Sequence, residues 1–234
     1  MQTEGKKMGG TASKYDKPAD IPSKFYRECV AKLPDLQGKV VAITGCTTGT
    51  GFHCARACAS KGAHVVLLNR SSERATAAHA SISKEYENAK VTFVPCDLTS
   101  FESVRLAAGA LKELFAATGI DVLCNNAGVM ALEDKACPEG YDVQMKTNHL
   151  SHFLLTREIL PLLEKAADLR GEARGVNHSS IAREGKKLDA KYLGKNGGNL
   201  GGNGASMLFG GARWLRYHQT KLANVVFTLA LADR

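Results

Sequence analysis

The stretch VVAITGCTTGTG, residues 40–51, decides the fold. It opens with a short apolar run typical of a buried strand and continues into the spacing G-x-x-x-G-x-G, formed by Gly45, Gly49 and Gly51. Glycines suit a tight turn whose backbone approaches a bound group and whose following helix packs closely on the strand. A helix that starts here offers free N–H groups and a positive dipole. Any tight strand-to-helix turn can carry such glycines, but this context favours a phosphate-binding site.

Outward from this stretch, short apolar runs alternate with longer amphipathic segments. The runs predicted as strands are 40–43, 64–68, 91–94, 120–124 and 175–177, and the predicted helices are 51–61, 72–87, 101–117, 141–167 and 217–233. Alternation of this kind requires right-handed crossovers and a mostly parallel sheet with helices on both faces. The predicted fold class is therefore α/β, with a doubly wound domain over residues 36–234.

Two segments stand apart from this alternation. Residues 1–35 form an N-terminal extension, with a short helix predicted over 22–33. Between Gly194 and Gly211, eight of eighteen residues are glycine, which predicts a flexible loop.

Composition excludes several classes of protein. With 44% hydrophobic and 23% charged residues in 234, the chain has material for one sizeable core and lacks the composition of a disordered protein. No apolar run approaches the roughly 18 residues that a membrane helix needs. The first thirty residues are polar and lysine-rich, so no secretory signal is predicted and a cytoplasmic location is expected.

The seven cysteines fit no paired framework. Their number is odd and no CxxC occurs, which indicates reduced core thiols. Cys54 and Cys58 share a helical face, but no histidine or second pair completes a zinc set. We expect no metal site.

The formal charge of +8 is concentrated in one region. Between Ile181 and Leu222 there are eight basic residues against two acidic ones. A nucleic-acid surface would add interleaved aromatic side chains for stacking, whereas this region carries the glycine-rich loop. We therefore expect no nucleic-acid partner. A solvated loop and a rim that attracts an anionic cofactor or substrate both remain open.

The end of the second predicted strand bears on cofactor choice. In dinucleotide-binding folds, an acidic side chain here accepts hydrogen bonds from the adenosine ribose and repels a 2′-phosphate. This chain has Asn69 followed by Arg70, which favours NADP(H) over NAD(H). The alternative is that Arg70 is a surface residue that closes a turn.

Six stretches together resemble one protein family. They are Thr44 to Gly51, Asp97-Leu98, Asn125 to Gly128, Asn148 to Phe153, Asn177 to Ser180 and Tyr217 to Asn224, spread over about 180 residues. In this order they resemble the short-chain dehydrogenase/reductase family, and most of all its retinol dehydrogenase-like and protochlorophyllide reductase-like members. The resemblance implies a Rossmann-like fold and a nicotinamide cofactor.

The resemblance also implies roles for individual residues. Asp97 would bond the adenine amino group, residues 125–128 would support the fourth strand beside the cofactor, and Lys221 would hold the nicotinamide ribose. The implied cofactor-binding set is Gly45, Thr47, Thr48, Gly49, Thr50, Gly51, Asn69, Arg70, Asp97, Leu98, Asn125, Ala127, Gly128, Tyr217 and Lys221. The implied catalytic tetrad is Asn148, Ser180, Tyr217 and Lys221.

The chemistry of carbonyl reduction supports these roles. Hydride transfer to a carbonyl leaves an alkoxide that a general acid must protonate. A tyrosine with a pKa near ~10 serves poorly unless its anion is stabilised, and a cation four residues later on the same helical face, Lys221 after Tyr217, provides this. Ser180 would hydrogen-bond the substrate oxygen, with Ser179 as the alternative serine. Asn148 would hold a water that relays protons to Lys221.

Four further side chains near these motifs are candidates for functional roles. We interpret His149, His152 and His178 as packing or hydrogen-bonding residues rather than as acids or ligands. Trp214, three residues before Tyr217, is expected at the rim of the pocket.

Two departures from the family pattern affect the prediction. The 37-residue separation of Ser180 and Tyr217 is longer than usual, because of the glycine-rich insert. The family pattern also continues past Arg234 with a strand, a Pro-Gly turn, a substrate-covering lobe and a last strand. The sequence is thus either a fragment or a degenerate relative.

These observations predict an NADP(H)-dependent oxidoreductase that acts on a carbonyl or alcohol of a hydrophobic molecule such as a retinoid. The alternatives are a protochlorophyllide reductase-like enzyme and a non-catalytic cofactor-binding scaffold. A homodimer through the helices that bear Asn148 and Tyr217 is possible by the resemblance.

Overall fold

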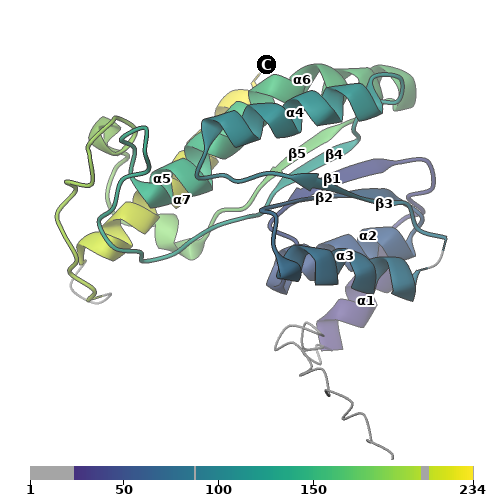
Figure 1. Cartoon of the computed structure of the whole chain (residues 1–234), viewed down its shortest axis with the longest axis horizontal. Helices are drawn as coiled ribbons and strands as arrows, with labels where there is room; N and C mark the ends of the chain where they lie inside the picture. The colour runs from purple at the N-terminus through teal and green to yellow at the C-terminus, as the bar shows by residue number, and fades with distance from the viewer. Residues whose placement is uncertain (1–23, 87, 207–210, 234) are drawn as a thin grey trace, which may run out of the picture.

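The computed structural model describes residues 24–86, 88–206 and 211–233. Its first element, α1 (Lys24–Lys32), matches the short helix predicted near the N-terminus. The remaining elements build a sheet with helices on either side (Figure 1). No helix of these ranges combines the length and the apolar character needed to cross a membrane.

Five parallel strands form the sheet: β1 (Val40–Thr44), β2 (His64–Asn69), β3 (Val91–Pro95), β4 (Val122–Asn125) and β5 (Arg174–Asn177). Their order is β3-β2-β1-β4-β5, so the direction of winding reverses at β1. The carboxyl ends of β1 and β4, on either side of that reversal, border the crevice where ligands bind in open sheets of this type. The predicted α/β fold with a parallel sheet is confirmed.

Helices cover both faces of the sheet. α2 (Gly49–Ser60) and α3 (Glu73–Glu85) lie on one face, and α4 (Phe101–Phe115) and α6 (Ser151–Arg170) lie on the other (Figure 1). Ser72 and Ser100 cap the starts of α3 and α4, because each side chain accepts a hydrogen bond from the backbone N–H three residues later. Gly171 ends α6 in the left-handed conformation at φ 86°.

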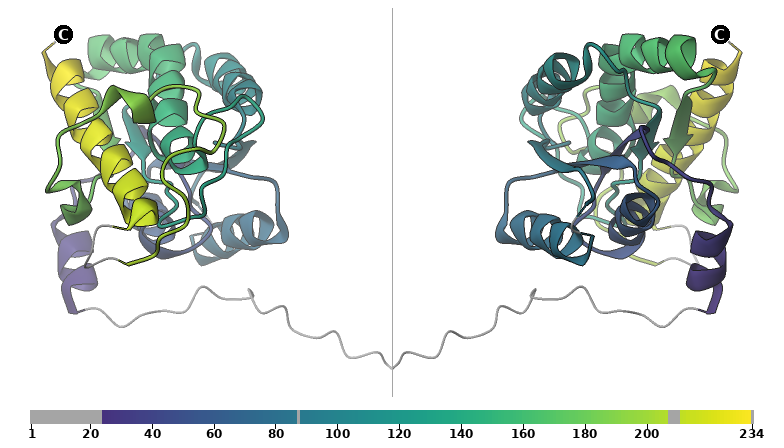
Figure 2. Two further views of the ribbon diagram at one scale, coloured as in Figure 1. Left: turned by 90° about the vertical axis from the view of Figure 1, so that its left-hand side faces the viewer. Right: turned by 90° about the vertical axis from the view of Figure 1, so that its right-hand side faces the viewer.

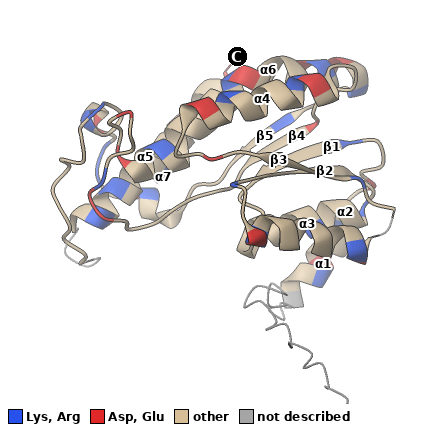
Figure 3. Ribbon diagram, viewed as in Figure 1, with Lys and Arg blue, Asp and Glu red and all other residues tan. Residues whose placement is uncertain are grey.

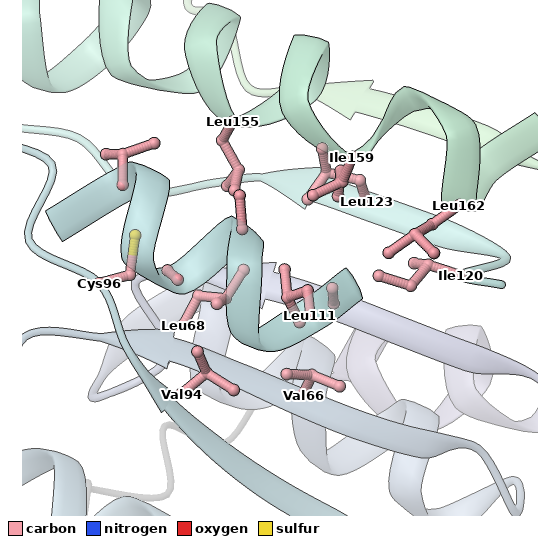
Figure 4. Packing of buried hydrophobic residues seen from close by; sticks show 14 of the residues in the cluster. Val66, Leu68, Val94, Cys96, Leu111, Ile120, Leu123, Leu155, Ile159 and Leu162 are labelled. Atoms are coloured by element: carbon pink, nitrogen blue, oxygen red, sulfur yellow. The ribbon is translucent and has the colours of Figure 1, made fainter. Parts of the chain in front are cut away.

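The larger core lies between the sheet and the helices α4 and α6. Its buried residues include Val66 and Leu68 from β2, Leu111 from α4 and Leu155 and Ile159 from α6. Figure 4 shows these side chains meeting in one layer. A second core, beneath α2 and α3, contains Val41, Ile43, Phe52 and Ile82. Burial on both faces explains why the strands are read as continuous apolar runs.

Two helices differ from their predicted bounds. The helix predicted over 141–167 is divided into α5 (Val143–Met145), a π-helical turn (Lys146–Leu150) and α6. The last helix, α7 (Ala212–Ala232), begins ahead of the predicted Tyr217 and runs along one end of the molecule (Figure 2). Within the described ranges β5 pairs with β4 alone, so its other edge is open, and Val176 on it is 48% exposed.

The glycine-rich stretch is more firmly held than a flexible loop would be. Asp134 Oδ2 accepts hydrogen bonds from the N–H groups of Leu200 (2.8 Å) and Gly202 (2.7 Å). Arg216 of α7, fully buried, donates to the carbonyl oxygens of Leu200 (3.2 Å), Gly202 (2.9 Å) and Leu132 (3.1 Å). Residues 207–210 of the predicted loop lie outside the described residues. The remainder is anchored by charged side chains that are far away in the sequence.

Candidate active site

The glycine turn has the form that an anion-binding site requires. Gly45 and Gly49 have φ of 71° and 62°, in the left-handed region. A Cβ on Gly51 would lie 2.3 Å from the Gly45 carbonyl oxygen, so only glycine fits at this position. Thr48, the N-cap of α2, makes no side-chain capping hydrogen bond. The first N–H groups of α2 thus lack a side-chain acceptor at the N-cap, as a site for phosphate oxygens requires.

A cleft of about 630 Å³ opens along the carboxyl ends of the strands. It is lined by segments that follow β1, β2, β3 and β4, as the sheet topology directs. The predicted cofactor residues on its walls are Gly45, Thr47, Thr48, Thr50, Gly51, Asn69, Arg70, Asp97, Leu98, Ala127 and Gly128. Gly49 and Asn125 are not on these walls. Asn125 is buried and donates to Thr156 (3.0 Å) and Asn177 (2.8 Å), which joins β4 to α6 and β5.

One end of this cleft is basic. Asn69 Oδ1 accepts from the Cys46 N–H (2.6 Å), while Asn69 Nδ2 is buried without a hydrogen-bond partner in the described structure. Arg70, Ser72 and Arg74 line the same end. Sequence reasoning missed Ser72 and Arg74. The sequence did contain a signal for Arg74. It is four residues after Arg70, at the beginning of α3, the helix that follows the carboxyl end of β2.

Among the described residues, Asp97 is the only acidic side chain on the walls of this cleft. Its Oδ1 accepts hydrogen bonds from the backbone N–H (2.9 Å) and the hydroxyl (2.8 Å) of Thr99. These contacts fix the carboxylate at the carboxyl end of β3, in the place where the resemblance puts the adenine contact.

A buried network ties the glycine turn to α6. Thr44 Oγ1 accepts from the N–H groups of Asn126 and Ala127, both at 3.0 Å, and lies 2.9 Å from His152 Nε2. His152 Nδ1 lies 3.1 Å from the carbonyl oxygen of Asn148, which can only accept, so Nδ1 carries the proton and Nε2 accepts from the Thr44 hydroxyl. Burial lowers the pKa of His152 to about 4, which keeps the ring neutral at pH 7.

A second cleft, of about 230 Å³, adjoins the first. Its walls include Ser180, Tyr217 and Lys221, three of the four predicted catalytic residues. It shares Asn126, Gly128, Val129 and His178 with the larger cleft, so the two clefts are continuous along these residues. The fold thus brings together residues of α7 and of the segments that follow β4 and β5.

Lys221 is held close to Tyr217. Its Nζ donates to the carbonyl oxygen of His178 (2.9 Å) and lies 5.7 Å from the centre of the Tyr217 ring. Burial lowers the pKa of Lys221, because desolvation penalises the ammonium. Ser179 donates its hydroxyl to the backbone oxygen of Lys221 (2.8 Å), whereas Ser180 Oγ accepts from the Ala182 N–H (3.2 Å).

Asn148, the fourth member, is fully buried and is on neither wall. Its side chain accepts from the Val129 N–H (2.7 Å) and donates to the Val129 carbonyl (2.8 Å) and to Thr220 (3.0 Å). Its backbone oxygen accepts from Asn224 (3.1 Å) as well as from His152. Asn148 therefore ties the segment after β4 to α6 and α7. A Cβ on Gly128 would be in ordinary contact with Asn148 Oδ1 (3.4 Å) and Lys221 Nζ (3.5 Å), so Gly128 lies beside both side chains.

Of the two alternatives for the basic region, the structure favours the solvated loop over a rim of the clefts. Figure 3 shows Lys and Arg on the loops around the beginning of α7. Four of the eight basic residues pair with carboxylates, namely Arg183, Lys191, Arg213 and Arg216. Of the eight, Lys221 alone is on the walls of the two clefts described above. The cations that face the larger cleft are instead Arg70 and Arg74.

The other side chains singled out in the sequence are also placed. His149 and His152 are buried and hydrogen-bonded, and His178 borders both clefts. Trp214 packs edge-on against Tyr217, with ring centres 6.2 Å apart, and donates to the Ala205 carbonyl.

All seven cysteines are free. Cys46, Cys96 and Cys137 are buried, and Cys54, Cys58 and Cys124 pack partly buried against the second core, so the prediction of core thiols is wrong for the exposed Cys29. Among the residues with described positions, no three His, Cys, Asp or Glu side chains are grouped to hold a metal ion.

Comparisons with known proteins agree with this geometry. Residues 39–190 match the family model described as short chain dehydrogenase. An oxidoreductase of Schizosaccharomyces pombe is 37% identical over 206 residues, which are 86% of this chain and 57% of that protein. Bovine retinol dehydrogenase 12 is 36% identical over 214 residues, covering 90% of this chain and 61% of its own length.

Solved structures share the fold. The structure of L-sorbose reductase from Gluconobacter frateurii, complexed with NADPH and L-sorbose, superposes with a TM-score of 0.61 at 25% identity, over 85% of this chain and 65% of that one. The chain thus spans about three fifths of the length of the relatives it matches. On the family model and these identities, the chain belongs to the short-chain dehydrogenase family.

Proposed function

We propose that this chain carries the cofactor site and catalytic residues of an NADP(H)-dependent oxidoreductase that interconverts a carbonyl and an alcohol on a hydrophobic small molecule. One observation carries the proposal. Ser180, Tyr217 and Lys221 line a cleft that is continuous with the cleft at the glycine turn. A proton donor, a cation and a hydroxyl thus stand at the end of a dinucleotide-sized groove.

The catalytic residues divide the chemistry among them. The nicotinamide supplies or accepts the hydride when the cofactor is bound. During reduction the Tyr217 hydroxyl gives its proton to the substrate oxygen, and the charge of Lys221 stabilises the tyrosinate that remains. Ser180 donates to the same oxygen as negative charge develops. Its neighbour Ser179 is less suited, because its hydroxyl already donates to the Lys221 backbone.

The basic end of the larger cleft supports NADP(H). Arg70 and Arg74 line the cleft together with Asn69, whose Nδ2 is unsatisfied, and the residue at the end of β2 is this neutral amide rather than a carboxylate. Guanidinium groups form strong charge-assisted hydrogen bonds with a phosphate, whereas an acidic residue here would repel it. The NADPH in the L-sorbose reductase structure is consistent with this choice.

Apolar side chains support a hydrophobic substrate. Met130, on the wall of the second cleft, is 55% exposed, and Leu132 lines the larger one. Ile181, the residue after Ser180, is 79% exposed. An apolar molecule that covers these side chains removes them from water, which favours its binding. The retinoid named in the bovine relative is one molecule of this kind.

A cofactor titration tests the proposal. Purified protein is titrated with NADPH and, separately, NADH, and binding is followed by quenching of its single tryptophan, Trp214. We expect saturable NADPH binding that Arg70→Ala and Arg74→Ala weaken and that Arg105→Ala, an exposed control outside both clefts, leaves unchanged. Failure of the folded protein to bind either cofactor would overturn the proposal. Aldehydes and ketones are then screened, with Tyr217→Phe as the inactive control.

A further inference from the structure

His218, directly after Tyr217 on α7, makes two hydrogen bonds that a neutral ring cannot make. Its Nδ1 lies 2.7 Å from the carbonyl oxygen of Ala182, and its Nε2 lies 2.8 Å from the carbonyl oxygen of Lys186. Carbonyl oxygens only accept, and a neutral imidazole has a single N–H. Both bonds are satisfied together only when His218 is an imidazolium with two N–H groups.

These bonds hold the segment that follows Ser180. The Arg183 N–H donates to the Ser180 carbonyl (3.1 Å), and the Ala182 N–H donates to Ser180 Oγ (3.2 Å), so Ser180 and the turn after it form one unit. His218 fastens this unit to α7 at Ala182. Gly185 lies beside the ring, because a Cβ there would be in ordinary contact with His218 Cε1 at 3.9 Å, and its φ of 126° is a conformation that other residues rarely adopt.

Gln219 adds two contacts that do not depend on protonation. Its Oε1 accepts from the Asp189 N–H (2.8 Å), and its Nε2 donates to the Lys187 carbonyl (3.0 Å). The far end of the segment is therefore held at any pH, while the end near Ser180 depends on His218.

The charges around His218 come from two elements. The segment brings Arg183, Glu184, Lys186, Lys187 and Asp189, and α7 brings Lys221 one turn along. Arg183 pairs with Glu184 at 3.8 Å, and Asp189 pairs with Lys191 at 3.2 Å. No carboxylate pairs with His218 in the part of the chain that is described. The ring nitrogens of His218 are hydrogen-bonded to the two carbonyl oxygens, and His218 is only 7% exposed.

We propose that His218 is a positioning residue: as an imidazolium it fastens residues 182–186 to α7 and thereby sets Ser180 beside Tyr217. Loss of its proton releases one of the two carbonyls and loosens the segment. The place of Ser180 therefore depends on whether His218 carries both ring protons. The consequence for turnover rests on the proposed function, whereas the protonation and the clamp do not.

Nuclear magnetic resonance of the ring nitrogens tests the protonation directly. In ¹⁵N-labelled protein at pH 6 we expect both Nδ1 and Nε2 of His218 to carry protons. As the pH rises, one proton leaves, and the backbone amides of residues 182–187 shift with the same midpoint. A neutral ring at pH 6, or amides that do not follow the ring, would overturn the proposal.

Limited trypsin digestion tests the clamp. Lys186 and Lys187 are exposed cleavage sites on the segment. At each pH, the rate of cleavage of the protein is divided by that of a free peptide of residues 181–190. We expect this ratio to rise about tenfold from pH 6 to 8.5, because the segment then loses a hydrogen bond to a charged group. His218→Gln should be cleaved at the high rate at every pH. His79→Gln, which removes a single ring contact on α3, should retain the wild-type profile. Equal profiles for wild type and His218→Gln would refute the clamp.

NADPH binding measured on the same samples separates the two proposals. If NADPH does not bind but the ring is doubly protonated and the clamp responds to pH, the proposed function fails and the role of His218 stands. If NADPH binds and a carbonyl substrate is reduced, kcat of the wild type should fall with the deprotonation of His218, while kcat of His218→Gln should lack that step.

Discussion

Acidification should lower the free energy of unfolding of this protein, because the buried and neutral His152 binds a proton more readily in the unfolded chain. His152 is 1% exposed and joins Thr44 of the glycine turn to the Asn148 carbonyl through two hydrogen bonds. Burial lowers its pKa from 6.5 to about 4 in the folded protein. Between these values the unfolded chain binds the proton and the folded protein does not, so stability falls as the pH drops from 6.5 towards 4.

The size of the effect follows from that interval. Each pH unit between the two pKa values is worth about 1.4 kcal/mol, so the loss approaches about 3 kcal/mol by pH 4. This is a large part of the roughly 5–15 kcal/mol by which a domain is stable. The pKa values of His149 and His64 are also lowered by burial, so they act in the same direction.

The matched variant is His152→Gln. Glutamine can donate to the Asn148 carbonyl and accept from the Thr44 hydroxyl, but it does not titrate. Urea unfolding of both proteins at pH 7.5, 5.5 and 4.2 gives the free energy of unfolding. We expect the wild type to lose about 2–3 kcal/mol more than the variant over this range. Acid-sensitive carboxylates are common to both and cancel in the difference. Parallel loss of stability in the two proteins would refute the reasoning.

Three further predictions concern the turn, the insert and the catalytic tyrosine. Gly51→Ala places a methyl group against the Gly45 carbonyl, which should lower the free energy of unfolding by about 1–3 kcal/mol and weaken NADPH binding; unchanged denaturation and titration curves would contradict it. Arg216→Met leaves Asp134 and Asp142 without their buried cation, and urea unfolding should show a loss of about 3–5 kcal/mol, whereas a neutral result would mean that the insert is held by other contacts. Tyr217→Phe should reduce kcat for a carbonyl substrate by about 10²–10⁴-fold with NADPH affinity retained; retained turnover would remove Tyr217 from the role of proton donor.

Local signals were sufficient for the sheet and for the glycine turn. Strands such as β1 and β2, buried on both faces, are written as unbroken apolar runs, and their alternation with helices dictates a parallel order. The fit of Gly51 could be anticipated, because tight turns between a strand and a helix have few solutions. The start of the last helix could not be anticipated. Arg216, in the first turns of α7, contacts the insert at Leu200 and the loop after β4 at Leu132, and both partners are distant in the sequence.

The sequence by itself thus determined the fold class, the glycine turn and the residue types at the proposed catalytic positions, because each depends on neighbours a few residues apart. Only the tertiary structure decided that Arg74 shares the cleft with Arg70, that Arg216 anchors the glycine-rich stretch, and that His218 contacts the carbonyl oxygens of Ala182 and Lys186. These contacts join elements that are distant along the chain. No local periodicity encodes them, because whether a polar side chain is buried and paired depends on which strands and helices become neighbours in the folded protein.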